Sequence, residues 1–374
     1  MVRRLVICVL ITCVHISAGG QDSVPLPRKL SLLFIGDIMG HDEQIKSARN
    51  SGGNTYNYDE VFRFIKPVIS EPDIAIANLE VTLGGPPYKG YPRFSSPAAL
   101  AAACKNAGID CLVTANNHSA DRGVEGITGT IKRLDSIGIR HTGTFLNREA
   151  RDSLYPLVIT SSGFSVALLN YTYGLNGLAV PTPVIVNMLN KSLITSDIEK
   201  ASLTNPDLII LFLHWGTEYD TIPSESQTDL ADYFFSLGVD LIIGSHPHVL
   251  QKMLWFRGDS AGKDRIVVYS LGNFITNQRK PKTDGGSMVR IDLMRNRDSI
   301  RISSAGYYLT WVYTPIEGTT KRFYILPCSE FEDKPDFFAD PSQYNQMKRF
   351  IKSSRALLNK QNSGIDEIVL TGKY

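Results

Sequence analysis

Short apolar runs alternate with amphipathic stretches along the first half of the chain. The apolar runs cover residues 30–35, 73–77 and 109–115, and each stops at a turn containing glycine or asparagine. The stretches with helical periodicity cover residues 59–69, 96–107 and 124–137. Short continuous apolar strands that alternate with helices predict parallel strands covered on both faces.

The second half repeats this pattern and then changes. Apolar runs cover residues 208–213, 239–243 and 265–270, with a helical stretch at 224–237, strand-like alternation between 287 and 326, and a helical stretch at 341–360. Alternation with period two predicts antiparallel strands with one solvated face. Because no Pro/Gly/Ser-rich linker divides the chain, we expect one α/β domain over residues 21–374. Its core motifs occupy 30–274, and C-terminal strands and a helix occupy 287–360.

The first twenty residues have the pattern of a secretory signal peptide. Arg3 and Arg4 precede an apolar stretch at 5–16, which is followed by the small residues of 17–20. The apolar stretch is shorter than the roughly twenty residues that a membrane-spanning helix needs. We therefore expect export and cleavage, with the protein periplasmic, extracellular or associated with the cell surface. Cys13 is a poor match to a lipid-attachment site because Thr12 directly precedes it.

Composition excludes some classes of function. The 374 residues carry 39 Lys+Arg and 37 Asp+Glu, a formal net charge of +2, so we expect no nucleic-acid partner. Cys104, Cys111 and Cys328 follow the predicted signal peptide. Three cysteines are too few for a disulfide framework, and their sequence context is typical of small buried residues.

Polar side chains capable of binding metal follow several of the predicted strands. They are Asp37, Glu80, Asn117, His118, His214, His246 and His248, with His41 close behind the first strand. In open α/β sheets, the loops at the carboxyl ends of the strands converge on one crevice. If the strands share one sheet, these side chains point into that crevice.

The types of side chain in this set indicate a transition-metal centre. Imidazoles mixed with carboxylates and an amide suit Zn²⁺, Mn²⁺ or Fe²⁺ better than Ca²⁺ or Mg²⁺. A single zinc site needs only three or four protein ligands. Six or seven candidates therefore fit two divalent ions about 3.5–4 Å apart with a bridging carboxylate, either Glu80 or Asp37.

Each residue also has a structural interpretation. An aspartate after a strand, such as Asp37, is commonly a turn or helix cap, and single histidines are commonly satisfied core residues. His246 and His248 are the strongest single indication, because Pro247 between them stiffens the turn and both imidazoles can face neighbouring ions. His141 lies on an ordinary strand, and we expect it to be structural.

Six motifs occur in a recognisable order. They are Gly36-Asp37-Ile38-Met39, Asn78-Leu79-Glu80, Ala115-Asn116-Asn117-His118 with Asp121-Arg122-Gly123, His214-Trp215-Gly216-Thr217-Glu218, Gly244-Ser245-His246-Pro247-His248-Val249 and Ser270-Leu271-Gly272-Asn273-Phe274. The series resembles the bacterial capsule-synthesis protein CapA family, also called poly-γ-glutamate biosynthesis proteins, within the calcineurin-like metallophosphoesterase superfamily. The resemblance covers about two thirds of the chain.

This resemblance implies a four-layer sandwich, with two central mixed β-sheets flanked by helices, and a dinuclear site. It implies that Asp37 and His248 bind one ion and that Glu80 bridges to the second. The ligands it implies for the second ion are Asn117, His214 and His246. His118 resembles the histidine that protonates the leaving group.

Two features depart from the superfamily pattern. His41 stands four residues after Asp37, where superfamily enzymes have Asp-x-His, so its role as a ligand is open. Asn-Leu-Glu at 78–80 replaces the usual Gly-Asp-x-x-Asp, which can change the geometry of the bridge.

Two classes of function follow. The first is an exported, dinuclear metal-dependent hydrolase acting on a phosphoester or on an anionic polymer such as poly-γ-glutamate. The second is a non-catalytic accessory factor that binds the polymer or a membrane-embedded exopolymer synthase. Tyr88, Tyr91 and Arg93 could contact an anionic substrate or belong to a solvated loop, and Asn273 could orient a metal ligand.

Overall fold

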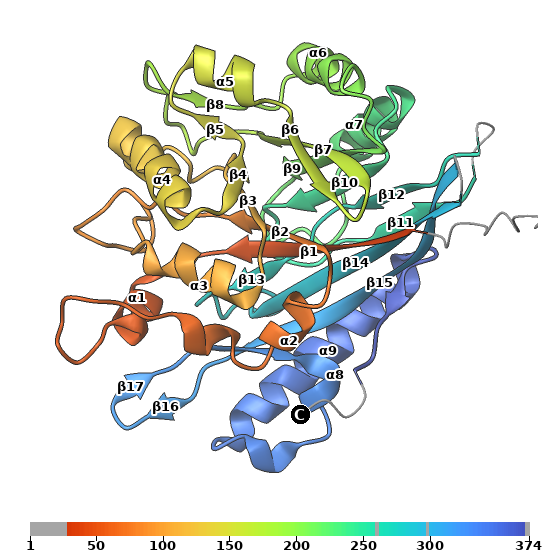
Figure 1. Cartoon of the computed structure of the whole chain (residues 1–374). Coiled ribbons are helices and arrows are strands. Elements are labelled where there is room, and N and C mark those ends of the chain that lie inside the picture. Colours follow the sequence, from red (N-terminus) through yellow and green to blue (C-terminus); the bar gives the residue numbers. More distant parts are fainter. Residues whose placement is uncertain (1–27, 259–261, 297–298, 371–374) are drawn as a thin grey trace, which may run out of the picture.

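Two large β-sheets face each other in the computed structural model, with helices on their outer sides (Figure 1). The structure describes residues 28–258, 262–296 and 299–370. The predicted signal peptide and Cys13 lie outside the described residues. No helix in the described part of the chain is long and apolar enough to span a membrane.

The first sheet has the order β18-β15-β14-β1-β2-β3-β4, with β13 also paired to β1 and β19 to β15. Its strands are β1 (Arg28–Ile38), β2 (Ile74–Leu79), β3 (Cys111–Val113), β4 (Arg140–Thr142), β13 (Asn273–Ile275), β14 (Gly285–Asn296), β15 (Ser299–Tyr313), β18 (Tyr324–Pro327) and β19 (Asp366–Glu367). Strands β1 to β4 are parallel, and β14, β15 and β18 are antiparallel neighbours. The C-terminal alternation is thus the antiparallel half of a mixed sheet, as expected.

The second sheet has the order β11-β12-β10-β9-β7-β6. Its strands are β6 (Leu157–Ser161), β7 (Phe164–Thr172), β9 (Leu208–His214), β10 (Leu241–Ser245), β11 (Met253–Phe256) and β12 (Arg265–Val268). The four inner strands are parallel, and the two edge strands are antiparallel to their neighbours. The strand ends that carry the candidate ligands are therefore divided between two sheets, so the condition that one sheet holds them all is not met.

Side-chain alternation along the strands builds the layers. In β1, Leu32 and Phe34 pack between the two sheets, whereas Leu33 and Ile35 pack under the outer helices. In β9, Leu208, Ile210 and Phe212 face the same inner core, and the residues of odd number face the helices of the opposite side. The predicted four-layer sandwich is confirmed.

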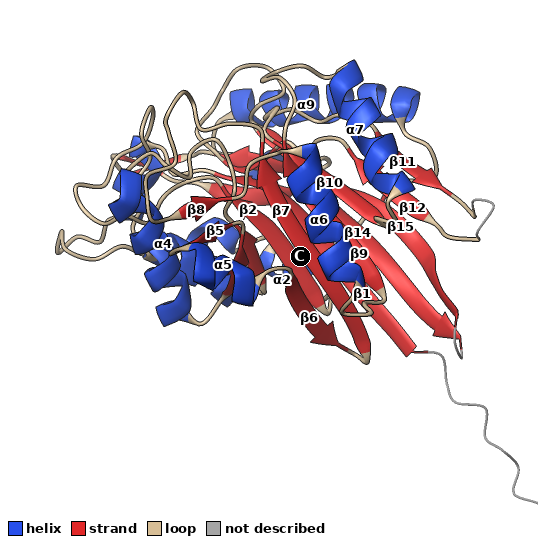
Figure 2. Cartoon of the chain, turned by 90° about the horizontal axis from the view of Figure 1, so that it is seen from above, coloured by secondary structure: helices blue, strands red, loops and turns tan. Residues whose placement is uncertain are grey.

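Helices cover both outer faces, and the C-terminal helices pack against the core between the sheets. The N-terminal ones are α1 (Asp42–Ala48), the 3₁₀ helix η1 (Asp59–Phe62), α2 (Lys66–Ile69), α3 (Ala99–Ala107) and α4 (Gly123–Ile137). The others are α5 (Arg148–Leu154), α6 (Lys191–Ser202), α7 (Glu225–Ser236), α8 (Cys328–Phe331), the 3₁₀ helix η2 (Pro335–Phe337) and α9 (Pro341–Gln361). Figure 2 shows α6 running over the strands of the second sheet. Helix α9 places Met347, Ile351 and Leu358 against the core between the sheets.

Two predicted helices differ from the observed ones. The stretch 59–69 is η1 followed by the short α2, because Pro67 has no N–H to donate to a carbonyl one turn earlier. The helix expected from Ser96 begins at Ala99, and the Ser96 N–H instead donates to the Thr82 carbonyl at 2.9 Å. The three described cysteines are buried and free, in agreement with their sequence context.

Two glycines allow the strand ends to approach each other. A Cβ on Gly36, just before Asp37, would lie 2.1 Å from the carbonyl oxygen of Gly272, and a Cβ on Gly244 would lie 2.0 Å from that of Tyr269. Real Cβ atoms do not approach oxygen so closely, so only glycine fits at either position. These contacts bring the ends of β1 and β10 against the segment that leads into β13.

Candidate metal centre

Loops from both sheets bring the predicted ligands together. Asp37 lies near the end of β1, Glu80 follows β2, and His214 ends β9. The set is completed by Asn117 and His118, which follow β3, and by His246 and His248, which follow β10. All of these side chains are buried, with exposed fractions between 0 and 4%. The two sheets therefore present their carboxyl-terminal ends to one shared polar cluster.

Glu80 is the centre of this cluster. Its Oε1 lies 3.6 Å from Nε2 of His214 and 3.6 Å from Nε2 of His248. Both carboxylate oxygens are buried without a hydrogen-bond partner. A carboxylate in this condition costs several kcal/mol unless a cation or a proton balances it. Burial and the neighbouring Asp37 accordingly raise the pKa of Glu80 well above its usual value.

Two groups of potential ligand atoms share Glu80. The first is Glu80, His246 and His248, and the second is Asp37, Glu80 and His214; within each, the atoms lie within 4.8 Å of one another. An orphaned carboxylate between two such groups is the arrangement that a pair of divalent ions with a bridging carboxylate requires. The donor set of imidazoles and carboxylates suits Zn²⁺, Mn²⁺ or Fe²⁺. The residues present therefore fit a dinuclear transition-metal site.

Asp37 is held by neighbours on both of its oxygens. Its Oδ1 accepts a hydrogen bond from Nδ2 of Asn78 at 2.8 Å, and its Oδ2 lies 3.1 Å from Nδ1 of His248. That Nδ1 is also 3.0 Å from Oδ1 of Asn273. Asn273 thus orients a candidate ligand, as proposed from its motif.

His214 is fixed through both ring nitrogens. Nδ1 lies 2.9 Å from Oγ of Ser245, and Nε2 lies 2.9 Å from Oδ1 of Asn117. Asn117 and His214 belong to different sheets, so this contact joins the two halves of the cluster. Nε2 is also the nitrogen that faces Glu80, which leaves it directed at the centre of the site.

Burial favours the neutral form of the imidazoles of His214 and His246. Burial, together with repulsion from the neighbouring imidazoles, lowers the pKa of His214 well below its usual value and that of His246 to about 3. A neutral imidazole has a free lone pair for a metal ion. Nδ1 of His246 is buried and has no hydrogen-bond partner.

The turn after β10 has an uncommon backbone conformation. His246 has φ of 101° and His248 has φ of 57°, and Pro247 lies between them. Non-glycine residues with positive φ are strained and concentrate at functional sites. This turn places both imidazoles within 4.8 Å of the carboxylate of Glu80.

His118 lies in a different environment from the ligands. Its Nδ1 is 2.7 Å from Oδ2 of Asp121, which also accepts a hydrogen bond from the backbone N–H of Phe94 at 2.7 Å. The ring packs edge-on against Phe94, with 4.6 Å between the centroids. Nδ1 is therefore occupied, and Nε2 is the nitrogen left to contact a substrate.

His41 lies beside the cluster and outside both groups of ligand atoms. Its Nδ1 is 2.9 Å from Oε1 of Gln44 and accepts a hydrogen bond from the Asn277 N–H at 3.2 Å. Burial lowers the pKa of His41 to about 4. His141, expected to be structural, lies on β4 with its Nε2 3.1 Å from Oδ1 of Asp135.

Some aromatic residues near the cluster were not found from the sequence. Tyr173 follows β7 and packs on His246 with 4.5 Å between ring centroids, while Tyr219 lies 6.3 Å from His248. The run that forms β7 contains Ser165 and Asn170, but its apolar residues 166–169 and the turn that follows the strand give the same signal as the other strands. Of the loop residues considered as substrate contacts, Tyr88 packs on Tyr56 and Tyr91 is 70% exposed.

The fold and the cluster define a class of protein: an α/β sandwich of two mixed sheets with a candidate dinuclear metal centre where their strands end. The family model "Bacterial capsule synthesis protein PGA_cap" matches residues 31–278, and the chain belongs to this family. This confirms the family indicated by the six motifs.

Two curated relatives are similar in sequence. The capsule biosynthesis protein CapA of Bacillus anthracis is 32% identical in an alignment of 288 residues, which covers 73% of this chain and 66% of that protein. The PGA biosynthesis protein CapA of Bacillus subtilis (strain 168) is 28% identical over 283 residues, covering 71% of this chain and 68% of that protein. The chain thus spans about two thirds of the length of these relatives.

Solved structures are similar at a lower level. NAD nucleotidase from Haemophilus influenzae has a TM-score of 0.49 and 12% sequence identity, and the match covers 92% of this chain and 65% of that chain.

Proposed function

We propose that this member of the capsule-synthesis family is a metal-dependent hydrolase that acts on a phosphoester or on an anionic polymer such as poly-γ-glutamate. The observation that carries the proposal is the buried carboxylate of Glu80, which has no hydrogen-bond donor and faces two imidazoles. Structural carboxylates at such depth are paired or hydrogen-bonded. An unbalanced one is favourable only when a cation or a proton completes the site, and the two groups of ligand atoms around Glu80 favour a cation.

The proposed ligands of the two ions are Asp37, Glu80, Asn117, His214, His246 and His248, with His41 open as a further ligand. When bound, such ions neutralise the buried carboxylates and polarise a substrate oxygen. The chain's own residues orient this site: Asn78 and Asn273 position Asp37 and His248 by hydrogen bonds.

His118 has the geometry of a proton donor. The Asp121 carboxylate holds Nδ1, so the ring can rotate little and Nε2 can face the leaving oxygen. A general acid acts best when it is free of the metal yet beside it, because its proton must remain transferable. His118 therefore protonates the leaving group, and Asp121 is its positioning residue.

Elemental mass spectrometry of the purified protein tests the proposal. We expect about two transition-metal ions per chain, loss of both in His246→Ala/His248→Ala, and retention in His141→Ala, which changes a histidine outside the cluster. Hydrolysis of phosphoesters and of γ-glutamyl polymers is then assayed with each protein. A chain that stays metal-free after exposure to Zn²⁺, Mn²⁺ and Fe²⁺ overturns it.

A second function is favoured by the names of the relatives. Both are described as biosynthesis proteins, which points to polymer assembly. In this alternative, the protein binds the polymer or a membrane-embedded synthase without turnover. Unchanged polymer binding in Glu80→Ala and His118→Ala, with no hydrolysis by the unaltered protein, supports it.

The proposal includes export, and this part of it rests on the sequence of residues 1–20 alone. The mass of the mature protein from the native host tests it: loss of about twenty residues indicates signal cleavage, and a lipid on Cys13 indicates anchoring. An intact N-terminus contradicts export by this route.

A further inference from the structure

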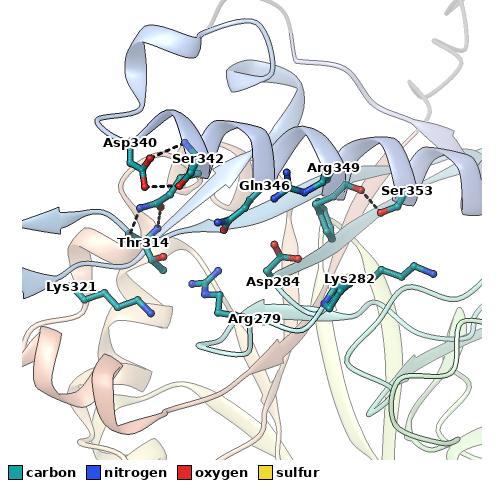
Figure 3. Close-up of a pocket in the computed structure, with 13 residues that line it drawn as sticks. Arg279, Lys282, Asp284, Thr314, Lys321, Asp340, Ser342, Gln346, Arg349 and Ser353 are labelled. Carbon is teal, nitrogen blue, oxygen red and sulfur yellow. Dashed lines mark hydrogen bonds between the residues drawn. The ribbon is translucent and has the colours of Figure 1, made fainter.

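A cavity of about 660 Å³ lies between the loop that follows β13 and helix α9 (Figure 3). The loop covers residues 276–284, and β17 (Thr320–Lys321) forms another part of the wall. The charged lining residues are Arg279, Lys282, Asp284, Lys321, Asp340 and Arg349. Four cations thus face two carboxylates.

Both carboxylates are already held by uncharged donors. Asp340 accepts hydrogen bonds from the backbone N–H of Ser342 at 2.8 Å and from its hydroxyl at 2.6 Å. Asp284 accepts one from Nε1 of Trp311 at 2.8 Å. Within the described residues, none of the four cations has a carboxylate oxygen within 4.0 Å. The cavity therefore has a positive charge that no ion pair balances.

Arg279 and Lys321 carry this charge at the centre of the cavity. The guanidinium of Arg279 projects toward α9 between Lys321 and Asp284 (Figure 3). It donates to the Val312 carbonyl at 3.0 Å, and Lys321 donates to Oδ1 of Asn277 at 2.6 Å, so both have neutral acceptors. Burial lowers the pKa of Arg279 to about 10, although the charge of Asp284 acts in the opposite direction, and burial together with the charge of Arg279 lowers the pKa of Lys321.

A second cavity differs in how its cations are paired. It has about 510 Å³ and lies on the side of the molecule where η1 meets β18. Two of its arginines are paired: Arg63 lies 3.3 Å from Glu60, and Arg322 lies 3.6 Å from Glu317. Its third arginine, Arg49, donates to the Gly53 carbonyl at 2.7 Å. Two of the three cations of this cavity thus have an ion-pair partner, whereas among the described residues none of the four cations of the first cavity has one.

The loop 276–284 is a wall shared by the cationic cavity and the metal cluster. The Asn277 N–H donates to Nδ1 of His41 at 3.2 Å, while its side chain accepts from Lys321. The next residue, Gln278, accepts from Nδ2 of Asn273 at 3.2 Å, and Asn273 contacts His248. The same loop thus contacts residues of the cavity and residues beside the metal cluster.

We propose that this cavity binds an anionic group, a carboxylate or a phosphate, of an extended substrate whose reacting part lies at the metal cluster. A guanidinium binds two oxygens of such a group in its plane, and a lysine adds a point charge. The inference rests on the proposed function for the position of the reacting part. The site itself rests on the unpaired cations.

Isothermal titration calorimetry with two small probes tests the site. The probes are inorganic tripolyphosphate and the tricarboxylate tricarballylate, titrated into the purified protein in the presence of a chelator. We expect Arg279→Gln/Lys321→Gln to weaken binding of the better probe at least tenfold. The matched control, Arg63→Gln/Lys46→Gln, removes the same charge elsewhere and should change Kd less than twofold. The probe that binds more tightly identifies the group as carboxylate or phosphate.

Absence of binding to the unaltered protein, or an equal loss in the control, overturns the proposal. Thermal unfolding checks that each variant is folded. Lys321→Gln alone, which removes no contact with the backbone, tests the site if Arg279→Gln does not fold. Glu80→Ala separates the two proposals, because it should abolish metal binding and leave probe binding within twofold. Probe binding in a chain that never takes up metal retains the anion site and rejects the hydrolase.

Discussion

Two buried polar regions of this protein differ in whether their charged groups have hydrogen-bond or ion-pair partners. Around Arg151, every charged group has a partner: its guanidinium contacts Asp197 and donates to Oδ1 of Asn187 at 2.7 Å, and the Tyr171 hydroxyl donates to Asp197 at 2.7 Å. In the metal cluster, Glu80 has no donor, and Nδ1 of His246 has no partner. Both regions are almost fully inaccessible to solvent.

This difference distinguishes a structural network from a candidate functional site. A satisfied network such as that of Arg151 joins α5, α6 and β7 and is complete without any ligand. The cluster at Glu80 is incomplete by itself, and its strained turn at 246–248 adds a further cost. Buried polar residues that lower stability because they lack partners indicate a site where a bound ligand supplies the missing interactions.

The strongest test of this comparison is Glu80→Ala. If Glu80 bridges two ions, its loss should remove metal and lower hydrolysis roughly 10⁴-fold, about 5 kcal/mol of transition-state stabilisation. Metal content and kcat/KM measure this, with His141→Ala as the control that keeps both. The related change Glu80→Gln should raise the thermal stability of the metal-free protein, because it removes an unbalanced buried carboxylate. A lower Tm would contradict the conclusion that the Glu80 carboxylate has no partner in the metal-free protein.

The opposite behaviour is expected for Arg151→Met. Removing one partner of a buried ion pair leaves Asp197 uncompensated and should cost about 3–5 kcal/mol of unfolding free energy. Urea unfolding measures the loss, and metal content per folded chain should not change. Stability within about 1 kcal/mol of the unaltered protein would show that this network is not structural.

A smaller effect is expected for Asp121→Asn. The amide cannot hold the His118 ring as the carboxylate does, so kcat should fall roughly 10- to 100-fold. KM and metal content should change little, which distinguishes lost orientation from a damaged site. If metal is lost along with kcat, Asp121 supports the ligands and His118 is not the acid.

The smallest effect concerns pH. The folded pKa values of His41 and His246, about 4 and about 3, lie below the usual value of 6.5. Between about pH 7 and pH 4 the unfolded chain therefore binds more protons, and the metal-free protein should lose stability as the pH falls. Glu80, whose pKa is raised, has the opposite slope, so the Glu80→Gln protein isolates the contribution of the imidazoles. Chemical unfolding at several pH values in chelator measures it, and a flat profile would contradict burial of neutral rings.

Much of the fold could be predicted because local periodicity reflects burial. The runs that became β1, β2, β3, β9 and β10 are continuous and apolar, since both faces of each strand are covered. The helix expected at 59–69 was wrong, because Pro67 interrupts the hydrogen-bond ladder. The run of β7 was overlooked, and with it Tyr173, which packs on His246.

The sequence by itself determined which residue types stand at the strand ends and to which family the chain belongs. Only the tertiary structure decided that strand ends from two sheets meet: Asp37 and His246 are 209 residues apart, yet the His246 N–H lies 3.4 Å from a carboxylate oxygen of Asp37. It also decided that Glu80 has no donor and that, among the described residues, no carboxylate oxygen lies within 4.0 Å of the cationic groups of Arg279 and Lys321. The reason is physical: periodicity records whether a side chain is buried, whereas its partners depend on chain crossings and close backbone approaches, such as that of Gly36 to Gly272, between distant segments.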